Sequence, residues 1–187
     1  MKHDTYTMAR FVDELRRITC ETSDERRIMA ALRPLVQRLA HSAAWVEPRL
    51  YEADAEQGFG AHVLHEEPDQ SLAVLAVSWL PGRGIPPHDH GTWGVVVGVD
   101  GLEENAFWER TDDRSRPGYA EVRRIGEKAF GPSDVLAMPT GMIHSVRNET
   151  GQVTLSLHVY GKHINFTERS KFDPDQRTET PFILKLA

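Results

Sequence analysis

The spacing of hydrophobic residues changes near residue 45 and divides the chain into two parts. In the first forty residues, apolar side chains recur every three or four positions, the spacing of one buried helix face. The first such stripe comprises Met8, Phe11, Val12, Leu15 and Ile18, and the second comprises Ile28, Leu32, Leu35 and Leu39. Thr22 and Glu25 form a T-x-x-E pattern that is typical of a helix start, and Pro34 is expected to kink or divide the second helix. The pattern predicts two or three N-terminal helices within residues 1–42.

After residue 45 the pattern changes to short segments rich in β-branched and aromatic residues, separated by Gly, Pro and Asp. The segments expected to be strands are 60–66, 72–80, 93–99, 102–109, 119–125, 134–138, 143–149 and 152–160. The run AVLAVSW is almost wholly apolar, as expected for a strand that is buried on both faces. Many short strands between turns predict a sandwich or closed barrel over 45–165. Residues 166–187 look irregular and are expected to lie against this barrel or to cover its mouth.

The composition fits one domain over residues 1–187, with 40% hydrophobic residues and a net charge of −6. An acidic chain is a poor candidate for non-specific nucleic-acid binding, which requires a cationic face. The chain has no run of about 18 apolar residues that would span a membrane, and its N-terminus lacks the apolar core of a signal peptide. The single cysteine, Cys20, is expected to be a small apolar filler between the helical stripes. We therefore expect a cytoplasmic protein without an intrachain disulfide.

Three histidines have the spacing of a metal site. His88 and His90 are two residues apart, so on one strand their side chains point to the same face. His144 follows about fifty residues later in a Pro-x-Gly-x-x-His turn. Neutral imidazole is the commonest protein ligand for divalent iron, copper, nickel and zinc. Three such ligands without an acidic fourth would leave coordination positions open for a substrate and oxygen.

Both segments that carry these histidines resemble the motifs of the cupin superfamily. The first motif is matched by Gly82, His88, His90 and Gly101, and the second by Pro139, Gly141, His144 and Asn148. The departure is Gly94, which stands where the first motif has a glutamate. The resemblance implies a mainly β fold, the cupin double-stranded β-helix or jelly-roll barrel, preceded by the helices. It also implies that His88, His90 and His144 hold one metal ion.

A second cluster of polar residues lies in the segment TLSLHVYG. Ser156, His158 and Tyr160 alternate with apolar residues and therefore share one face of a strand. Inside a small barrel these groups would have to hydrogen-bond to one another. An S-x-H-x-Y strand that follows a three-histidine cupin site resembles the thiol dioxygenases, which include cysteine dioxygenase and bacterial 3-mercaptopropionate dioxygenase. The resemblance implies an enzyme with one Fe(II) per chain that adds both atoms of O2 to a thiol sulfur and forms a sulfinate.

Two departures from the cysteine enzymes bear on the substrate. A cysteine joined to the triad tyrosine is missing, because Gly94 and Val95 occupy its neighbourhood. An arginine on the first barrel strand is missing too, and its position falls near His62. The bacterial mercaptopropionate enzymes carry an arginine nine residues beyond the tyrosine, which matches Arg169. A guanidinium group binds a carboxylate in a bidentate fork. Arg169 and His62 are thus the expected substrate-binding residues.

These features predict a dioxygenase for a small thiol carboxylate, with 3-mercaptopropionate as the leading substrate. Cysteine remains an alternative, and mercaptosuccinate would need a second cationic contact from His62 or Arg147. Two further alternatives are a three-histidine oxygenase that cleaves diketones or aromatic diols and a small-molecule-binding cupin without catalysis. The expected partners are the thiol carboxylate and O2, with no nucleic acid and no membrane. The expected assembly is a monomer or a weak homo-oligomer.

Overall fold

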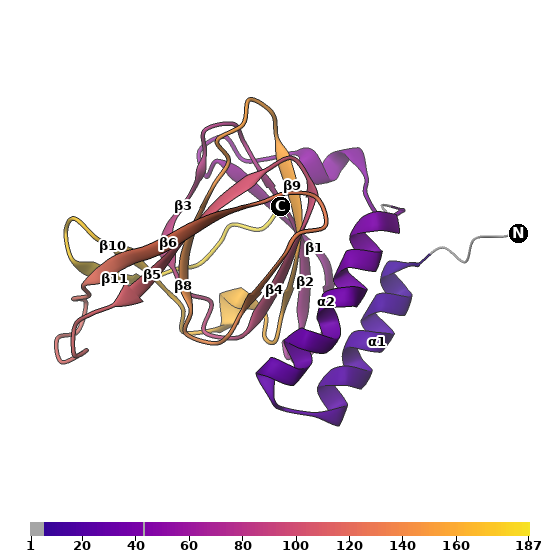
Figure 1. Cartoon of the computed structure of the whole chain (residues 1–187), viewed down its shortest axis with the longest axis horizontal. Helices are drawn as coiled ribbons and strands as arrows, with labels where there is room; N and C mark the ends of the chain where they lie inside the picture. Colours follow the sequence, from indigo (N-terminus) through magenta and orange to yellow (C-terminus); the bar gives the residue numbers. More distant parts are fainter. Residues whose placement is uncertain (1–5, 43) are drawn as a thin grey trace, which may run out of the picture.

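Two antiparallel sheets face each other in the computed structural model, which describes residues 6–42 and 44–187 (Figure 1). The first sheet has the order β1-β2-β9-β4-β7, with β1 at Phe59–Glu66, β2 at Ala73–Trp79, β9 at Thr154–Tyr160, β4 at Gly94–Asp100 and β7 at Val135–Met138. The second has the order β11-β10-β3-β8-β5-β6, with β11 at Thr178–Pro181, β10 at Ser170–Asp173, β3 at Gly84–His88, β8 at Ile143–Arg147, β5 at Glu103–Arg110 and β6 at Val122–Phe130.

The eight strands from β2 to β9 form a jelly roll. The chain alternates between the two sheets, so that β2, β4, β7 and β9 belong to one sheet and β3, β5, β6 and β8 to the other. Two interleaved four-stranded sheets of this order are the architecture of the cupin-type double-stranded β-helix. The predicted fold class is therefore confirmed.

Strands β2 and β9 lie in the middle of the first sheet and are buried along their whole length. Because side chains alternate along a strand, Leu75 and Val77 of β2 point into the barrel, where they pack with Tyr160. Val74 points to the other face and packs against the N-terminal helices. This double burial explains why the run AVLAVSW is apolar at almost every position.

The helices α1 (Met8–Glu21) and α2 (Glu25–Ser42) cover the outer face of the first sheet (Figure 1). Their apolar stripes are buried as predicted, with the exception of the partly buried Met8 and Leu35. The prediction that Pro34 divides the second helix is wrong, because α2 is continuous. The side chain of Asp24, rather than Thr22, accepts the backbone N–H groups of Arg26 and Arg27 at the start of α2. Cys20 is exposed and is not a core filler.

The C-terminal segment departs from the prediction of irregular structure. Residues Ser170–Asp173 and Thr178–Pro181 form the β10–β11 hairpin, whose first strand pairs with β3 through Lys171 and His88. The hairpin extends away from the helices, while the chain end returns to the barrel (Figure 1). There Leu184 is buried, and Phe182 and Leu186 pack with the same interior cluster. Strand β3 itself was not among the predicted strands.

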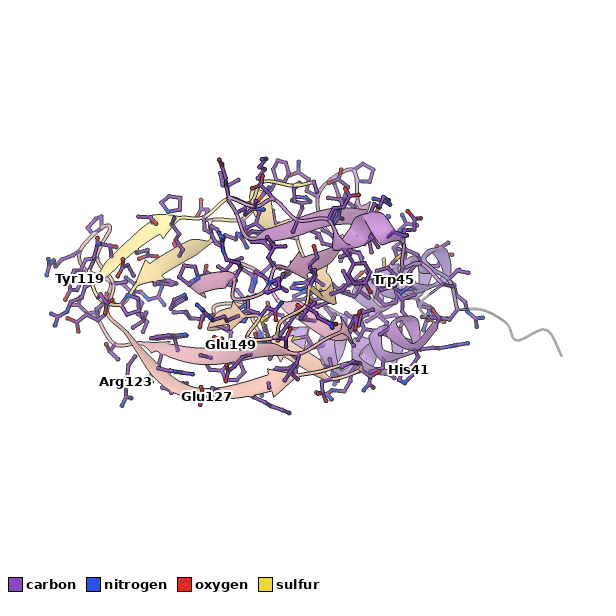
Figure 2. The ribbon with its side chains drawn as sticks, turned by 90° about the horizontal axis from the view of Figure 1, so that it is seen from above. His41, Trp45, Tyr119, Arg123, Glu127 and Glu149 are labelled. Atoms are coloured by element: carbon purple, nitrogen blue, oxygen red, sulfur yellow. The ribbon has the colours of Figure 1, made fainter. Side chains whose placement is uncertain are left out.

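The opposite edge of the second sheet is β6, which is exposed along almost all of its length. Figure 2 shows Arg123 and Glu127 along this strand, on the outside of the molecule. Charged side chains on an edge strand discourage pairing with another chain. No helix within the described ranges is both long enough and apolar enough to cross a membrane.

Candidate metal centre

His88, His90 and His144 meet inside the barrel, and one ring nitrogen of each lies within 4.8 Å of those of the other two. His88 is the last residue of β3 and pairs directly with His144 of β8. His90 lies just beyond the end of β3, so the two nearby histidines do not share a strand as predicted. The hydroxyl group of Thr167 donates a hydrogen bond to the His90 carbonyl at 2.8 Å and anchors this loop. The predicted trio is nevertheless brought together.

Hydrogen bonds to the outer ring nitrogens orient two of the three imidazoles. His88 Nδ1 lies 2.9 Å from the Pro86 carbonyl, and His144 Nδ1 lies 2.9 Å from Asn105 Oδ1. Because both partners are acceptors, Nδ1 carries the proton in each ring and Nε2 keeps a free lone pair. The Nε2 atom of His144 is buried with no hydrogen-bond partner. An orphaned buried acceptor of this kind fits a ligand of a metal ion.

The three rings are uncharged at neutral pH. Burial, together with the neighbouring histidines and the Arg169 cation, holds the pKa of His88 and of His90 well below the usual range. Burial and then the Arg169 charge lower the pKa of His144 to about 4. Neutral imidazole is the form that binds a metal ion. The donor set therefore fits a divalent transition metal.

Gly94 occupies the place of the missing acidic ligand because Tyr160 fills the adjoining space. The two residues pair across β4 and β9. A Cβ atom on Gly94 would lie 3.0 and 3.1 Å from carbons of the Tyr160 ring and 3.2 Å from the Met138 methyl group. These approaches are closer than ordinary van der Waals contact, so a longer side chain would displace the tyrosine. The ring centroid of Tyr160 lies 5.1 Å from that of His90.

Ser156, His158 and Tyr160 form the predicted hydrogen-bond chain on the inner face of β9. The Ser156 hydroxyl lies 2.9 Å from His158 Nε2, and the Tyr160 hydroxyl lies 2.8 Å from His158 Nδ1. All three side chains are buried. Burial, with a smaller contribution from His144, lowers the pKa of His158 to about 3, and burial raises the pKa of Tyr160 above its usual range. Both groups are therefore neutral near pH 7.

Arg169 lies at the base of the β10–β11 hairpin and is 97% buried, with 3% of its surface exposed. Its Nε–H donates to the Phe182 carbonyl at 2.9 Å, and the guanidinium carbon lies 4.2 Å from the centroid of the Phe182 ring. Its Nη2 is buried and has no hydrogen-bond partner within residues 6–42 and 44–187. Burial lowers the pKa of this cation to about 10, so it stays charged at neutral pH.

Asp89 lies between His88 and His90, but its carboxylate is turned toward β10. It binds the residue after Arg169, because Asp89 Oδ1 accepts the Ser170 N–H at 2.8 Å and Asp89 N donates to the Ser170 carbonyl at 3.0 Å. Burial raises the pKa of this carboxyl group. These two hydrogen bonds hold the loop that carries His90 against the segment that carries Arg169.

Two residues that the sequence placed near the substrate lie elsewhere. His62 is on the outer face of the first sheet, where its Nε2 bonds to the Glu52 carbonyl at 2.9 Å. Its neighbour Ala61 takes the inward position. Arg147 is 58% exposed and forms an ion pair with Glu149. The predicted contact of His62 with the substrate does not follow from this arrangement.

Sequence reasoning missed two polar residues of the barrel interior, Glu103 and Asn105. They are two apart on β5 and both point inward. Asn105 orients His144, as described above, and Glu103 accepts a hydrogen bond from Thr154 Oγ1 at 3.1 Å. The period-two spacing of the two polar residues was visible in the sequence, but nothing local indicated which face of the strand was buried.

No family model matches the chain. Among solved structures, oxalate oxidase in complex with the substrate analogue glycolate is 15% identical with a TM-score of 0.47, over 63% of this chain and 59% of that one. An uncharacterized double-stranded β-helix protein from Klebsiella pneumoniae is 13% identical (TM-score 0.48, 69% and 91% covered). KdgF from a Halomonas species is 18% identical (TM-score 0.41, 58% and 84% covered). The chain thus spans about three fifths of the oxalate oxidase. With TM-scores below 0.5, these likenesses add nothing to the fold assignment, which depends on the strand order.

Proposed function

We propose that this protein is an Fe(II)-dependent dioxygenase that converts a small carboxylated thiol, with 3-mercaptopropionate as the leading substrate, into a sulfinate. The observation that carries the proposal is the buried Arg169 beside the three histidines. Its charge lowers the pKa of all three imidazoles, and one of its nitrogens has no hydrogen-bond partner among the described residues. A metal site next to an unsatisfied buried cation suits a substrate that carries both a metal-binding group and an anion.

Arg169 supplies the anion-binding half of this site. A buried guanidinium group with an unpaired N–H is costly unless an anion binds to it. The Phe182 carbonyl holds Nε and the Phe182 ring lies against the guanidinium plane, so the orientation of the group is set before the substrate binds. The carboxylate of the substrate would accept the free Nη2–H in a charge-assisted hydrogen bond. This contact fixes how far the thiol reaches toward the histidines.

His88, His90 and His144 would hold the iron, and Tyr160 would face the reacting atoms. A bound ferrous ion supplies Lewis acidity that lowers the pKa of the thiol, and it supplies the electrons needed to activate O2. Tyr160 holds its proton at neutral pH, because burial raises the pKa of its phenol. His158 Nδ1 fixes the orientation of that hydroxyl group at 2.8 Å. The aromatic ring of Phe182 lies 5.5 Å from that of His88 and helps to exclude water.

The arrangement favours a monocarboxylic thiol over a dicarboxylic one. Mercaptosuccinate would require a second cation near the site, and the two candidates for that role do not face it. His62 lies behind the sheet, and Arg147 is exposed and paired with Glu149. Arg169 can satisfy one carboxylate, as in 3-mercaptopropionate. Cysteine presents one carboxylate as well and is the alternative.

A matched pair of substrates tests the function. The iron-loaded protein is given 3-mercaptopropionate or 1-propanethiol, which has the same chain without the carboxylate, and oxygen uptake and product mass are recorded. We expect a product that has gained two oxygen atoms, and a strong preference for the acid. In Arg169→Gln we expect KM for the acid to rise roughly 10- to 100-fold, while the plain thiol is unaffected. The control Arg147→Gln should behave as the wild type.

Two outcomes would overturn this proposal. Oxygen uptake with a catechol or a diketone, and none with 3-mercaptopropionate, cysteine or mercaptosuccinate, would assign the site to carbon–carbon bond cleavage. Binding of iron without oxygen uptake for any of these compounds would indicate a binding protein. Unchanged kinetics in Arg169→Gln would remove Arg169 from the site but would leave the reaction class in place.

A further inference from the structure

Glu103 is a buried carboxyl group for which neither the metal site nor the substrate contacts provide a role. It begins β5 and is 6% exposed, inside the barrel. Thr154 Oγ1 donates to its Oε1 at 3.1 Å, and Ser156, two residues further along β9, is close enough to oppose the rise of its pKa. Thr154, Ser156, His158 and Tyr160 alternate along the inner face of β9. The carboxyl group therefore lies at the far end of the Ser156–His158–Tyr160 chain.

Hydrogen bonds link Ser156 through His158 to Tyr160, and Glu103 lies at the Ser156 end of this path. Ser156 Oγ lies 2.9 Å from His158 Nε2, and His158 Nδ1 lies 2.8 Å from the Tyr160 hydroxyl. A hydroxyl group can donate one hydrogen bond while accepting another, and a neutral imidazole donates from one nitrogen and accepts at the other. The hydrogen bonds along this path can therefore all point in either direction. Which direction they take depends on the group at the Ser156 end of the path.

We propose that Glu103 is the terminal acceptor of a proton relay that begins at Tyr160, and that the protonation state of Glu103 sets the direction of the chain. When Glu103 is ionised it only accepts. Ser156 then donates to Glu103, His158 Nε2–H donates to Ser156, and Tyr160 donates to His158 Nδ1. The phenol oxygen presents a lone pair to the substrate in this state.

One proton transfer reverses the whole chain without leaving a charge on any intermediate member. On the proposed function, which this step presupposes, the thiol S–H gives its proton to the Tyr160 oxygen and becomes a thiolate. The original phenol proton passes to His158 Nδ1, the Nε2 proton passes to Ser156, and the hydroxyl proton of Ser156 passes to Glu103. The negative charge moves from Glu103 to sulfur. Tyr160 then points its O–H toward the substrate and can donate a hydrogen bond there.

The electrostatics of the interior support this role. Burial raises the pKa of Glu103 to about 7, against the opposing effects of Ser156, Thr154 and Trp79, so both protonation states exist near neutral pH. His158, with its pKa lowered to about 3, stays neutral and can change only its tautomer. The other titratable groups that line the same space are His144, whose pKa is lowered to about 4, and Asp134, whose Oδ2 accepts the Gly131 N–H at 3.0 Å.

A small cavity lies beside the chain. Glu103, Asn105, His144 and His158 are among the residues that line it, and the space open to the centre of a water molecule is about 20 Å³. That volume holds about one water molecule. One water could adjust the hydrogen bonds of Glu103 as its charge changes, while bulk water stays outside.

The tautomer of His158 is a direct readout of the proposed direction and needs no enzyme activity. The protein is labelled with ¹⁵N-histidine and loaded with Zn²⁺ as a diamagnetic metal, and the ring nitrogen shifts are followed with pH. The His158 signals are assigned by comparison with His158→Gln. We expect Nε2–H above about pH 7 and Nδ1–H below it. In Glu103→Gln this transition should vanish, whereas Glu104→Gln, the same change on the opposite face of β5, should keep it.

A second variant keeps the proposal testable if Glu103→Gln does not fold. Thr154→Val removes a hydrogen bond to the carboxylate without touching the chain, so the midpoint of the His158 transition should move to higher pH. One tautomer throughout the titration of the wild type would overturn the proposal, as would an unchanged midpoint in both variants. In the iron enzyme, kcat/KM should rise as the pH increases through about 7, and this rise should be absent in Glu103→Gln. Failure of the thiol assays alone would overturn the proposed function and leave the tautomer result standing.

Discussion

The substitution Glu103→Gln should remove one pH-dependent contribution to stability, and the structure sets the size of the effect. In the folded protein burial raises the pKa of Glu103 from the usual 4.5 to about 7. The folded state therefore binds a proton more tightly than the unfolded state does. It follows that the contribution of Glu103 to stability is fully present below pH 4.5, falls as pH rises toward 7, and is constant above that. Glutamine removes this dependence because it does not titrate.

Between about pH 5 and about pH 8, the two pKa values correspond to a loss of about 2.5 kcal/mol in the contribution of Glu103, so Glu103→Gln should gain about this much stability relative to the wild type. Comparing the two proteins at both pH values cancels any pH-independent effect of replacing a carboxyl group by an amide. For a chain of this size the difference corresponds to roughly 5–10 °C in melting temperature.

Urea unfolding of the chelator-treated proteins, followed by circular dichroism at both pH values, measures this difference. Glu104→Gln is the control, because the same chemical change is made where water reaches the side chain. Equal pH dependence in the wild type and Glu103→Gln would refute the reasoning, since it would mean that Glu103 titrates alike in the folded and unfolded states. A loss of stability in Glu103→Gln relative to the wild type over the same pH range would contradict its sign.

Three further substitutions test the surroundings of the metal centre. Gly94→Ala should destabilise the protein by about 1–3 kcal/mol, because the added methyl group would lie 3.0 Å from the Tyr160 ring. Thermal unfolding measures this change in stability. An unchanged stability would show that the Tyr160 ring moves aside without cost. Asn105→Ala should lower metal affinity roughly 10- to 100-fold, because His144 loses the hydrogen-bond partner that orients its ring. Titration with Zn²⁺ measures the affinity. Asn165→Ala is the control, because Asn165 bonds to the Leu184 carbonyl and not to a histidine of the metal centre. Tyr160→Phe should keep the metal and lower turnover, which metal analysis and oxygen uptake separate; equal turnover would contradict a role for the hydroxyl group.

The motifs of the metal centre could be recognised in the sequence because each one is a short run of neighbouring residues. The H-x-H spacing, the Pro-x-Gly-x-x-His turn and the S-x-H-x-Y alternation predicted residues that the structure does bring together inside the barrel. The helical stripes and most of the strands followed from periodicity in the same way.

Predictions that depended on the distant surroundings of a residue were less successful. Cys20 was expected to fill space between the two helical stripes, but it lies on α1, on a side of the helix that is exposed. The β10–β11 hairpin lacks a strong alternating pattern, and it forms because β3 offers it an edge to pair with. That pairing places Arg169, which directly precedes β10, beside the three histidines.

The sequence alone determined the fold class, the three histidines and the polar face of β9, because strand periodicity and short motifs are properties of neighbouring residues. Only the tertiary structure decided which other polar groups share that interior. The register between strands, which no local pattern encodes, turned Glu103 and Asn105 inward and His62 outward. Burial then altered the chemistry of these groups, because a charge removed from water shifts its protonation equilibrium in a way that residue type alone does not reveal.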